Sequence, residues 1–120
     1  MDAGTFPTRR MNMEKFNFDE VRDQLKEASV IQSEEDMGGL FGKGPSYVSS
    51  AKSKGKSVSL DALTHMAFNI EQEIQEFEDD VRTNTNITPE RWNQASILWE
   101  LQSDLFEQIR GMVGQSRNQP

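Results

Sequence analysis

The chain has 120 residues, no cysteine and a net charge of −7. The absence of cysteine excludes disulfides, thiolate catalysis and cysteine metal sites. No apolar run approaches the roughly 20 residues that a membrane-spanning helix needs. Residues 1–15 contain two arginines with no apolar stretch after them, so they do not resemble a secretory signal. We therefore expect a soluble, cytoplasmic protein of one small domain, or of a small domain with a helical appendage.

The first predicted helix follows an N-terminal arm. Residues 1–16 are expected to be flexible. A helix is predicted over 17–29, because Asn17 followed three residues later by Glu20 forms a capping box. Apolar residues then recur at helical spacing, at Phe18, Val21, Leu25 and Ala28.

Two short helices are predicted next, with a glycine turn between them. Ser33 followed by three acids is typical of a helix N-terminus, so a second helix is predicted over 34–41. Gly42 is expected to end it. Pro45 suits the first turn of a third helix, predicted over 45–54.

Two long helices are predicted to complete the chain. Ser59 is expected to cap a fourth helix over 60–83, and a fifth is expected over 88–113. The fourth has a narrow apolar stripe, made of Leu60, Leu63, Ala67, Ile70, Ile74, Phe77 and Val81. The sequence has no strand-period run and predicts an all-α fold. A helix-turn-helix head (17–70) precedes a long antiparallel helical hairpin (71–114) and a disordered tail (115–120).

Charge is distributed unevenly along the chain. Residues 37–60 hold four lysines and no acid. The preceding residues hold nine acids and five bases, and the following residues hold eleven acids and four bases. A surface that serves only solubility would not separate positive from negative residues along the chain in this way. The middle segment is therefore a candidate contact surface for an anionic partner. The alternative is a serine- and lysine-rich loop that is basic by chance.

Residues 33–70 resemble the lambda-repressor-like (Xre-type) helix-turn-helix DNA-binding domain, with 18–29 as its first helix. Met37 stands where the family has a leucine, Gly38 at its alanine and Gly42 at its turn glycine. The sequence SYVS, at residues 46–49, opens the recognition helix as in many family members. The core stripe of the family is matched by Leu63, Ala67 and Ile70.

The resemblance implies that the third helix enters the major groove of double-stranded DNA. It implies base-edge contacts by Pro45, Ser46 and Ser50, on a face shared with Ser49 and Ser53. It also implies phosphate contacts by Ser33, Lys43, Lys52, Lys54 and Lys56. The expected function is a transcriptional regulator of bacterial, phage or mobile-element type.

Two alternatives remain open. Glu34 to Asp36 would flank the phosphates, so the fold can have been kept while DNA binding was lost. In that case the chain is an adaptor or antiactivator that binds another protein through its acidic helices. No nucleophile is placed with a base and an orienting group, and His65 is expected on the surface. We therefore predict no enzyme activity, no catalytic residue, no cofactor and no metal site.

The fifth helix has a broader apolar face than one antiparallel neighbour can cover. A homodimer or partner interface is therefore predicted there. Its expected residues are Trp92, Leu98, Trp99, Leu105, Phe106, Ile109 and Met112. The alternative is that the first helix and the head fold back and cover this face within one chain.

Overall fold

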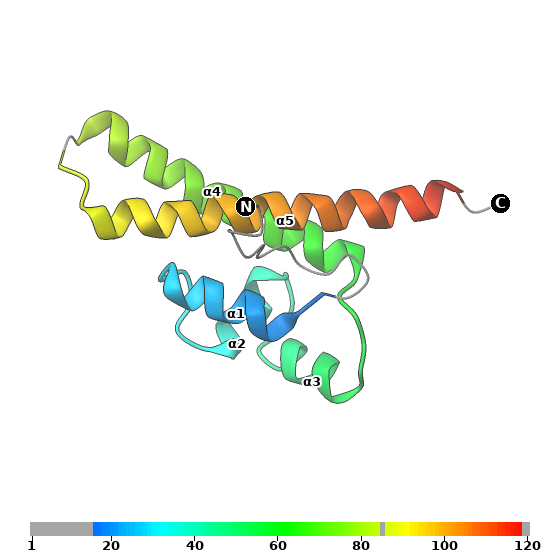
Figure 1. Cartoon of the computed structure of the whole chain (residues 1–120). Coiled ribbons are helices and arrows are strands. Elements are labelled where there is room, and N and C mark those ends of the chain that lie inside the picture. Colours follow the sequence, from blue (N-terminus) through cyan, green and yellow to red (C-terminus); the bar gives the residue numbers. More distant parts are fainter. Residues whose placement is uncertain (1–15, 85, 119–120) are drawn as a thin grey trace, which may run out of the picture.

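The computed structural model describes residues 16–84 and 86–118, and it has no strand in these ranges (Figure 1). The all-α prediction is confirmed. The helices are α1 (Phe18–Glu27), α2 (Glu34–Leu40), α3 (Tyr47–Ser53), α4 (Leu60–Thr83) and α5 (Pro89–Asn118). None of the described helices is long and apolar enough to cross a membrane.

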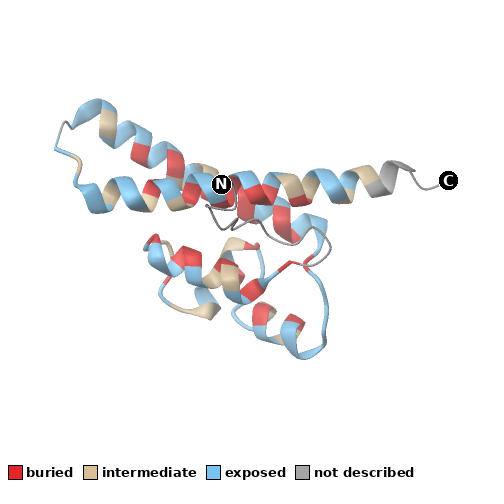
Figure 2. Ribbon diagram, in the orientation of Figure 1, coloured by how far each residue is buried: buried red, intermediate tan, exposed pale blue. Residues whose placement is uncertain are grey.

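The long helices α4 and α5 form the expected antiparallel hairpin, and α1, α2 and α3 form a small head beside it (Figure 1). α1 packs on α5, while α2 packs on both α3 and α4. Figure 2 shows buried residues where the head and the hairpin face one another. One core cluster contains side chains from all five helices, so head and hairpin are packed together.

The expected helix starts of α1, α2 and α4 are confirmed by their capping hydrogen bonds. The side chain of Asn17 accepts from the Glu20 amide at 2.9 Å, and that of Ser59 accepts from the Ala62 amide at 3.1 Å. Ser33 caps α2 by accepting from the Asp36 amide at 3.4 Å. These short side chains satisfy amide groups that have no partner within the helix.

The bounds of α3 and α5 differ from the prediction by the largest margins at the start of α3 and the end of α5. α3 begins at Tyr47, because the Tyr47 amide donates to the Gly44 carbonyl at 3.2 Å and closes a turn that contains Pro45. α5 continues to Asn118, so residues 115–118 of the expected disordered tail are helical. A glycine such as Gly114 costs a helix only about 1 kcal/mol, which a packed helix can tolerate. Residues 119–120 lie outside the described residues.

The N-terminal arm was predicted one residue too long. Phe16 is buried, and its ring lies edge-on to the rings of Phe18 and Phe41, with distances of 5.1 and 6.0 Å between the ring centroids. The ring of Tyr47, in α3, packs against that of Phe41 with 5.3 Å between the centroids and completes this aromatic cluster. The cluster ties the start of α1 to α2 and α3, so Phe16 belongs to the head. The rest of the predicted arm, residues 1–15, lies outside the described residues.

Two adjacent glycines of α2 have different surroundings. Gly38 is buried, and a Cβ atom there would overlap the carbonyl oxygen of Gly44. A Cβ atom at Gly39 would have no neighbour within 4 Å. Gly38 therefore lets α2 approach the turn before α3, whereas Gly39 only weakens the helix.

We predict opposite effects of alanine at these two positions. Gly38→Ala should lower the free energy of unfolding by about 1–3 kcal/mol, because the backbone at Gly44 must move. Gly39→Ala should raise it by about 0.8–1 kcal/mol through helix propensity alone. Urea denaturation followed by circular dichroism measures both. Equal effects of the two variants would contradict the close approach at Gly38.

Candidate nucleic-acid interface

An open groove lies between α3, the turn before it and the segment that leads into α4. Its volume is about 520 Å³. Three lysines, four serines and no acid line it. We call it the basic groove, and its lining residues are Lys43, Gly44, Ser46, Tyr47, Ser50, Ala51, Lys54, Lys56, Ser57 and Ser59.

The local sequence explains how the groove forms. Val48 and Ala51 are buried and fix the inner face of α3 against the core. Gly55 ends α3 with a φ of 65°, a left-handed conformation that glycine adopts at little cost. The chain then turns back and is anchored by buried Val58. Lys56, before this anchor, therefore lies beside α3.

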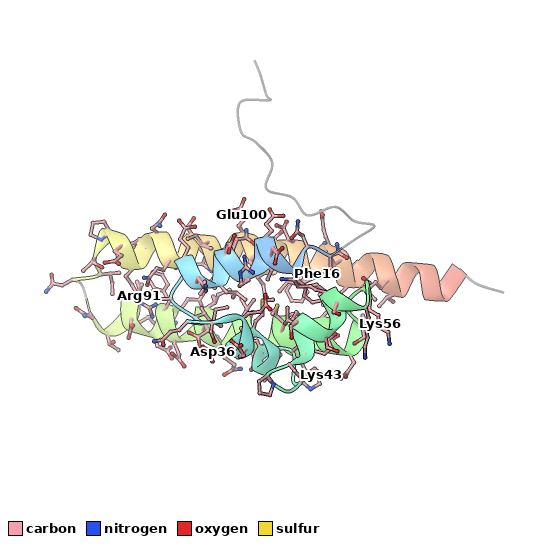
Figure 3. All side chains as sticks on the ribbon, turned by 90° about the horizontal axis from the view of Figure 1, so that it is seen from below. Phe16, Asp36, Lys43, Lys56, Arg91 and Glu100 are labelled. Carbon is pink, nitrogen blue, oxygen red and sulfur yellow. The ribbon has the colours of Figure 1, made fainter. Side chains whose placement is uncertain are left out.

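The three groove lysines have few acidic neighbours. Lys43 Nζ lies 3.4 Å from Asp61 Oδ2, and both side chains are partly exposed. Lys54 and Lys56 have no ion pair among the residues that the structure describes. Figure 3 labels Lys43 and Lys56, which lie on the same side of the molecule near α3. The groove therefore offers ammonium groups to an anion from solvent.

Lys52, predicted to contact phosphate, instead forms ion pairs within the chain. Its Nζ lies 2.7 Å from Asp19 Oδ1 on α1 and 3.0 Å from Glu34 Oε1 on α2. Arg22 contacts the same two carboxylates at 3.0 and 3.2 Å. We call Asp19, Arg22, Glu34 and Lys52 the head ion-pair cluster. It joins α1, α2 and α3, so Lys52 is removed from the predicted phosphate-binding set.

The ion pairs keep these groups charged. The hydrogen bond from Lys52 lowers the pKa of Asp19, and the hydrogen bonds to Asp19 and then to Glu34 raise the pKa of Lys52. The hydrogen bond to Asp23, followed by that to Glu34, raises the pKa of Arg22. Glu34, which the sequence placed near the phosphates, thus has two cations beside it. Its charge is offset inside the head.

Other predicted DNA-contacting residues are only partly brought together. The groove includes Ser46 and Ser50, whereas Pro45, Ser49 and Ser53 are exposed outside its lining. The Ser49 hydroxyl donates to the Ser46 carbonyl at 3.3 Å, and Ser33 is occupied as the cap of α2.

The sequence prediction missed Ser57, Ser59 and Tyr47 as groove residues. Gly55 could have indicated that Ser57 and Ser59 line the groove, because a left-handed glycine brings the following residues back beside the helix.

The predicted interface residues of α5 also divide into two groups. Leu98 and Leu105 are 2% and 0% exposed, so they belong to the core and cannot form part of a free surface. Ile109 and Met112 are half-buried against the core. The reason is that α1 and α4 both cover α5, as one of the alternatives anticipated. Three of the predicted residues remain substantially exposed, namely Trp92, Trp99 and Phe106.

The acidic face of α4 is largely paired or solvated. Asp79 pairs with Arg82, and Asp80 lies 3.3 Å from Arg91 Nη2. Within residues 16–84 and 86–118, no group of three or more acidic or histidine side chains is arranged to hold a metal ion. The His65 side chain is 53% exposed and lies over Gly42, in agreement with a surface position.

Comparison with known proteins shows which part of the chain matches a family model. Residues 18–118 match the model of DUF6626, described as a family of unknown function. No curated protein and no solved structure matches the chain significantly. The matched range begins with α1 and ends with α5, so it covers both the head and the hairpin.

The head ion-pair cluster predicts a pH-dependent effect of Lys52→Met. At pH 7 the variant should lose about 0.5–1 kcal/mol of unfolding free energy, as expected for partly exposed ion pairs. The lowered pKa of Asp19 means that its contribution is present above its ordinary pKa, near 3.9, and is lost as the pH falls through the lower folded-state value. The difference from wild type should therefore shrink below about pH 4.

Lys54→Met is the matched control for this prediction, because Lys54 is the C-cap residue of the same helix and has no ion pair among the described residues. Its unfolding free energy should stay within about 0.5 kcal/mol of wild type at every pH. Urea denaturation at several pH values measures both variants. A Lys52→Met effect no larger than that of Lys54→Met would show that the cluster does not stabilise the head.

Proposed function

The chain belongs to DUF6626, a family of unknown function, and we propose that it binds double-stranded DNA through the basic groove of its head. In this proposal it is a transcriptional regulator of bacterial, phage or mobile-element type, acting in the cytoplasm. One observation carries the proposal: three lysines line one groove without an acid, in a chain whose net charge is −7. Such a local excess of positive charge favours a polyanionic partner.

The composition of the groove suits a phosphate backbone. Lysine ammonium groups contact phosphates as point charges, and serine hydroxyls donate hydrogen bonds to phosphate oxygens. Ser46 and Ser50 are short, so they allow the backbone of α3 to approach the duplex closely. Lys54 and Lys56 follow at the end of α3, where they can reach neighbouring phosphates.

The same composition limits sequence recognition. The groove contains no Arg, Asn or Gln, the side chains that make bidentate contacts with guanine or adenine. Most of the affinity should therefore come from phosphates and depend strongly on salt. Three lysine contacts per head give an expected slope of about −2.7 for log affinity against log salt concentration. In a homodimer, two such grooves would act together and offset the weak base recognition of one.

We predict that Lys54→Gln/Lys56→Gln weakens DNA binding and reduces its salt dependence. The slope per head should change from about −2.7 to about −0.9, because two of three phosphate contacts are lost. The measurement is fluorescence anisotropy with labelled random-sequence duplexes, titrated between about 50 and 200 mM salt. Lys52 is left unchanged, because it forms ion pairs with Asp19 and Glu34 within the head.

Lys26→Glu is the control, because it changes the net charge by the same amount at an exposed position on α1 outside the groove. It should keep the wild-type slope. Absence of duplex binding by the wild type in low salt would refute the proposal, as would equal slopes for the two variants. A protein that co-purifies with a non-binding wild type, and also with Lys54→Gln/Lys56→Gln, would support the adaptor instead.

A further inference from the structure

The large apolar side chains that remain exposed are confined to the hairpin within the described part of the chain. They are Leu60 and Phe68 on α4, and Trp92, Trp99, Phe106 and Val113 on α5, with exposed fractions between 37% and 63%. The head, by contrast, buries its phenylalanines in the aromatic cluster. Exposed apolar side chains gathered in this way are typical of an interaction surface.

Four of these residues form one line along α5. Trp92, Trp99, Phe106 and Val113 follow one another at intervals of seven residues, so they share one side of the helix. We call them the α5 stripe. It extends over about 32 Å at 1.5 Å per residue. Repetition every seven residues is the spacing at which two helices can pack along their length.

The described residues of the chain cover one edge of the α5 stripe. The ring of Phe77, on α4, contacts the rings of Trp92 and Trp99 edge-on at 5.0 and 5.8 Å. These contacts hold the two indoles in place but leave them 45% and 41% exposed. α1 packs on another side of α5, where Ser29 accepts a hydrogen bond from Gln94 at 3.1 Å. With respect to the described residues, the outer side of the stripe is therefore open, and its indoles are held in place.

We propose that the occupant of the α5 stripe is a second copy of the chain, packed antiparallel through the same stripe. This register places Trp99 beside Phe106 of the second copy, and Trp92 beside its Val113. The symmetry axis then passes near Ser103. Each apolar residue thereby meets another apolar residue, and the same surface serves both chains, as a twofold interface requires. The inference goes beyond DNA binding and stands without it.

The flanks of the stripe favour this arrangement. Ser96 and Ser103 are exposed and small, and they leave room for rings between successive turns. Arg110 is exposed, and no ion pair joins it to another described residue. In the antiparallel register it lies between Trp92 and Trp99 of the second copy, where a guanidinium can stack on an indole. Parallel packing would instead place Arg110 beside Arg110 and add repulsion.

The available area is compatible with a small dimer interface. Three aromatic side chains, each a little under half exposed, contribute roughly 300 Å². The smallest stable interfaces bury about 600 Å² on each partner. The other half of this buried area must come from Val113, Arg110, the exposed serines Ser96 and Ser103, and the exposed side of α4. We therefore expect a dimer that dissociates on dilution.

The test measures the mass and the packing geometry of the assembly that the 120-residue chain forms. Light scattering at high concentration should give twice the chain mass of 13.7 kDa for the wild type. Phe106→Glu should return the mass to that of one chain, because it places a charge at the centre of the interface. Asn93→Glu, the control, adds the same charge at an exposed position of α5 off the stripe and should leave the dimer intact. Circular dichroism checks that both variants fold.

The natural chain has no cysteine, so a single introduced thiol reports the register. Ser103→Cys should form a disulfide-linked dimer under mild oxidation much faster than Asn93→Cys. A wild type that stays at 13.7 kDa at high concentration would overturn the proposal, even if the stripe then binds another protein. A dimer that survives Phe106→Glu, or that crosslinks equally at both cysteine positions, would also overturn it.

Discussion

The packing of α5 against two neighbours is the constraint on which the rest of the structure depends. α4 and α1 both cover α5 and bury Leu98, Leu101 and Leu105 almost completely. Each large aliphatic side chain removed from water in this way contributes about 1.5–3 kcal/mol. The same contacts attach the head to the hairpin, and they determine which side of α5 is left for Trp99 and Phe106.

Charge is used in two separate ways in the head. In the head ion-pair cluster, Lys52 and Arg22 join three helices and compensate Glu34. In the basic groove, Lys54 and Lys56 lack such partners among the described residues and remain available. Lysines in one short segment therefore differ in role because α3 directs them to different sides. A lysine close to a carboxylate is already partly neutralised, so Lys54 and Lys56 are better suited than Lys52 to binding an external anion.

Much of the fold was predictable because its signals are local. The caps Asn17, Ser33 and Ser59 and the turn glycine Gly42 each act within a few residues, and the structure places them as expected. Errors occurred where a distant contact decided the outcome. Phe16 packs against Phe41, twenty-five residues away in the sequence. Contacts between residues far apart in the sequence cannot be inferred from the pattern of neighbouring residues.

The sequence by itself determined the all-α class, the helical hairpin and the segregation of lysines into residues 37–60, because periodicity, capping and composition are properties of neighbouring residues. Only the tertiary structure decided which lysines pair with acids of the described residues and which apolar residues of α5 are exposed. Lys52 and Lys54 are equivalent by composition, yet only Lys52 meets Asp19 and Glu34. Leu105 and Phe106 are adjacent, yet only Leu105 faces the core. Both distinctions arise because burial and pairing depend on which helices pack together in space.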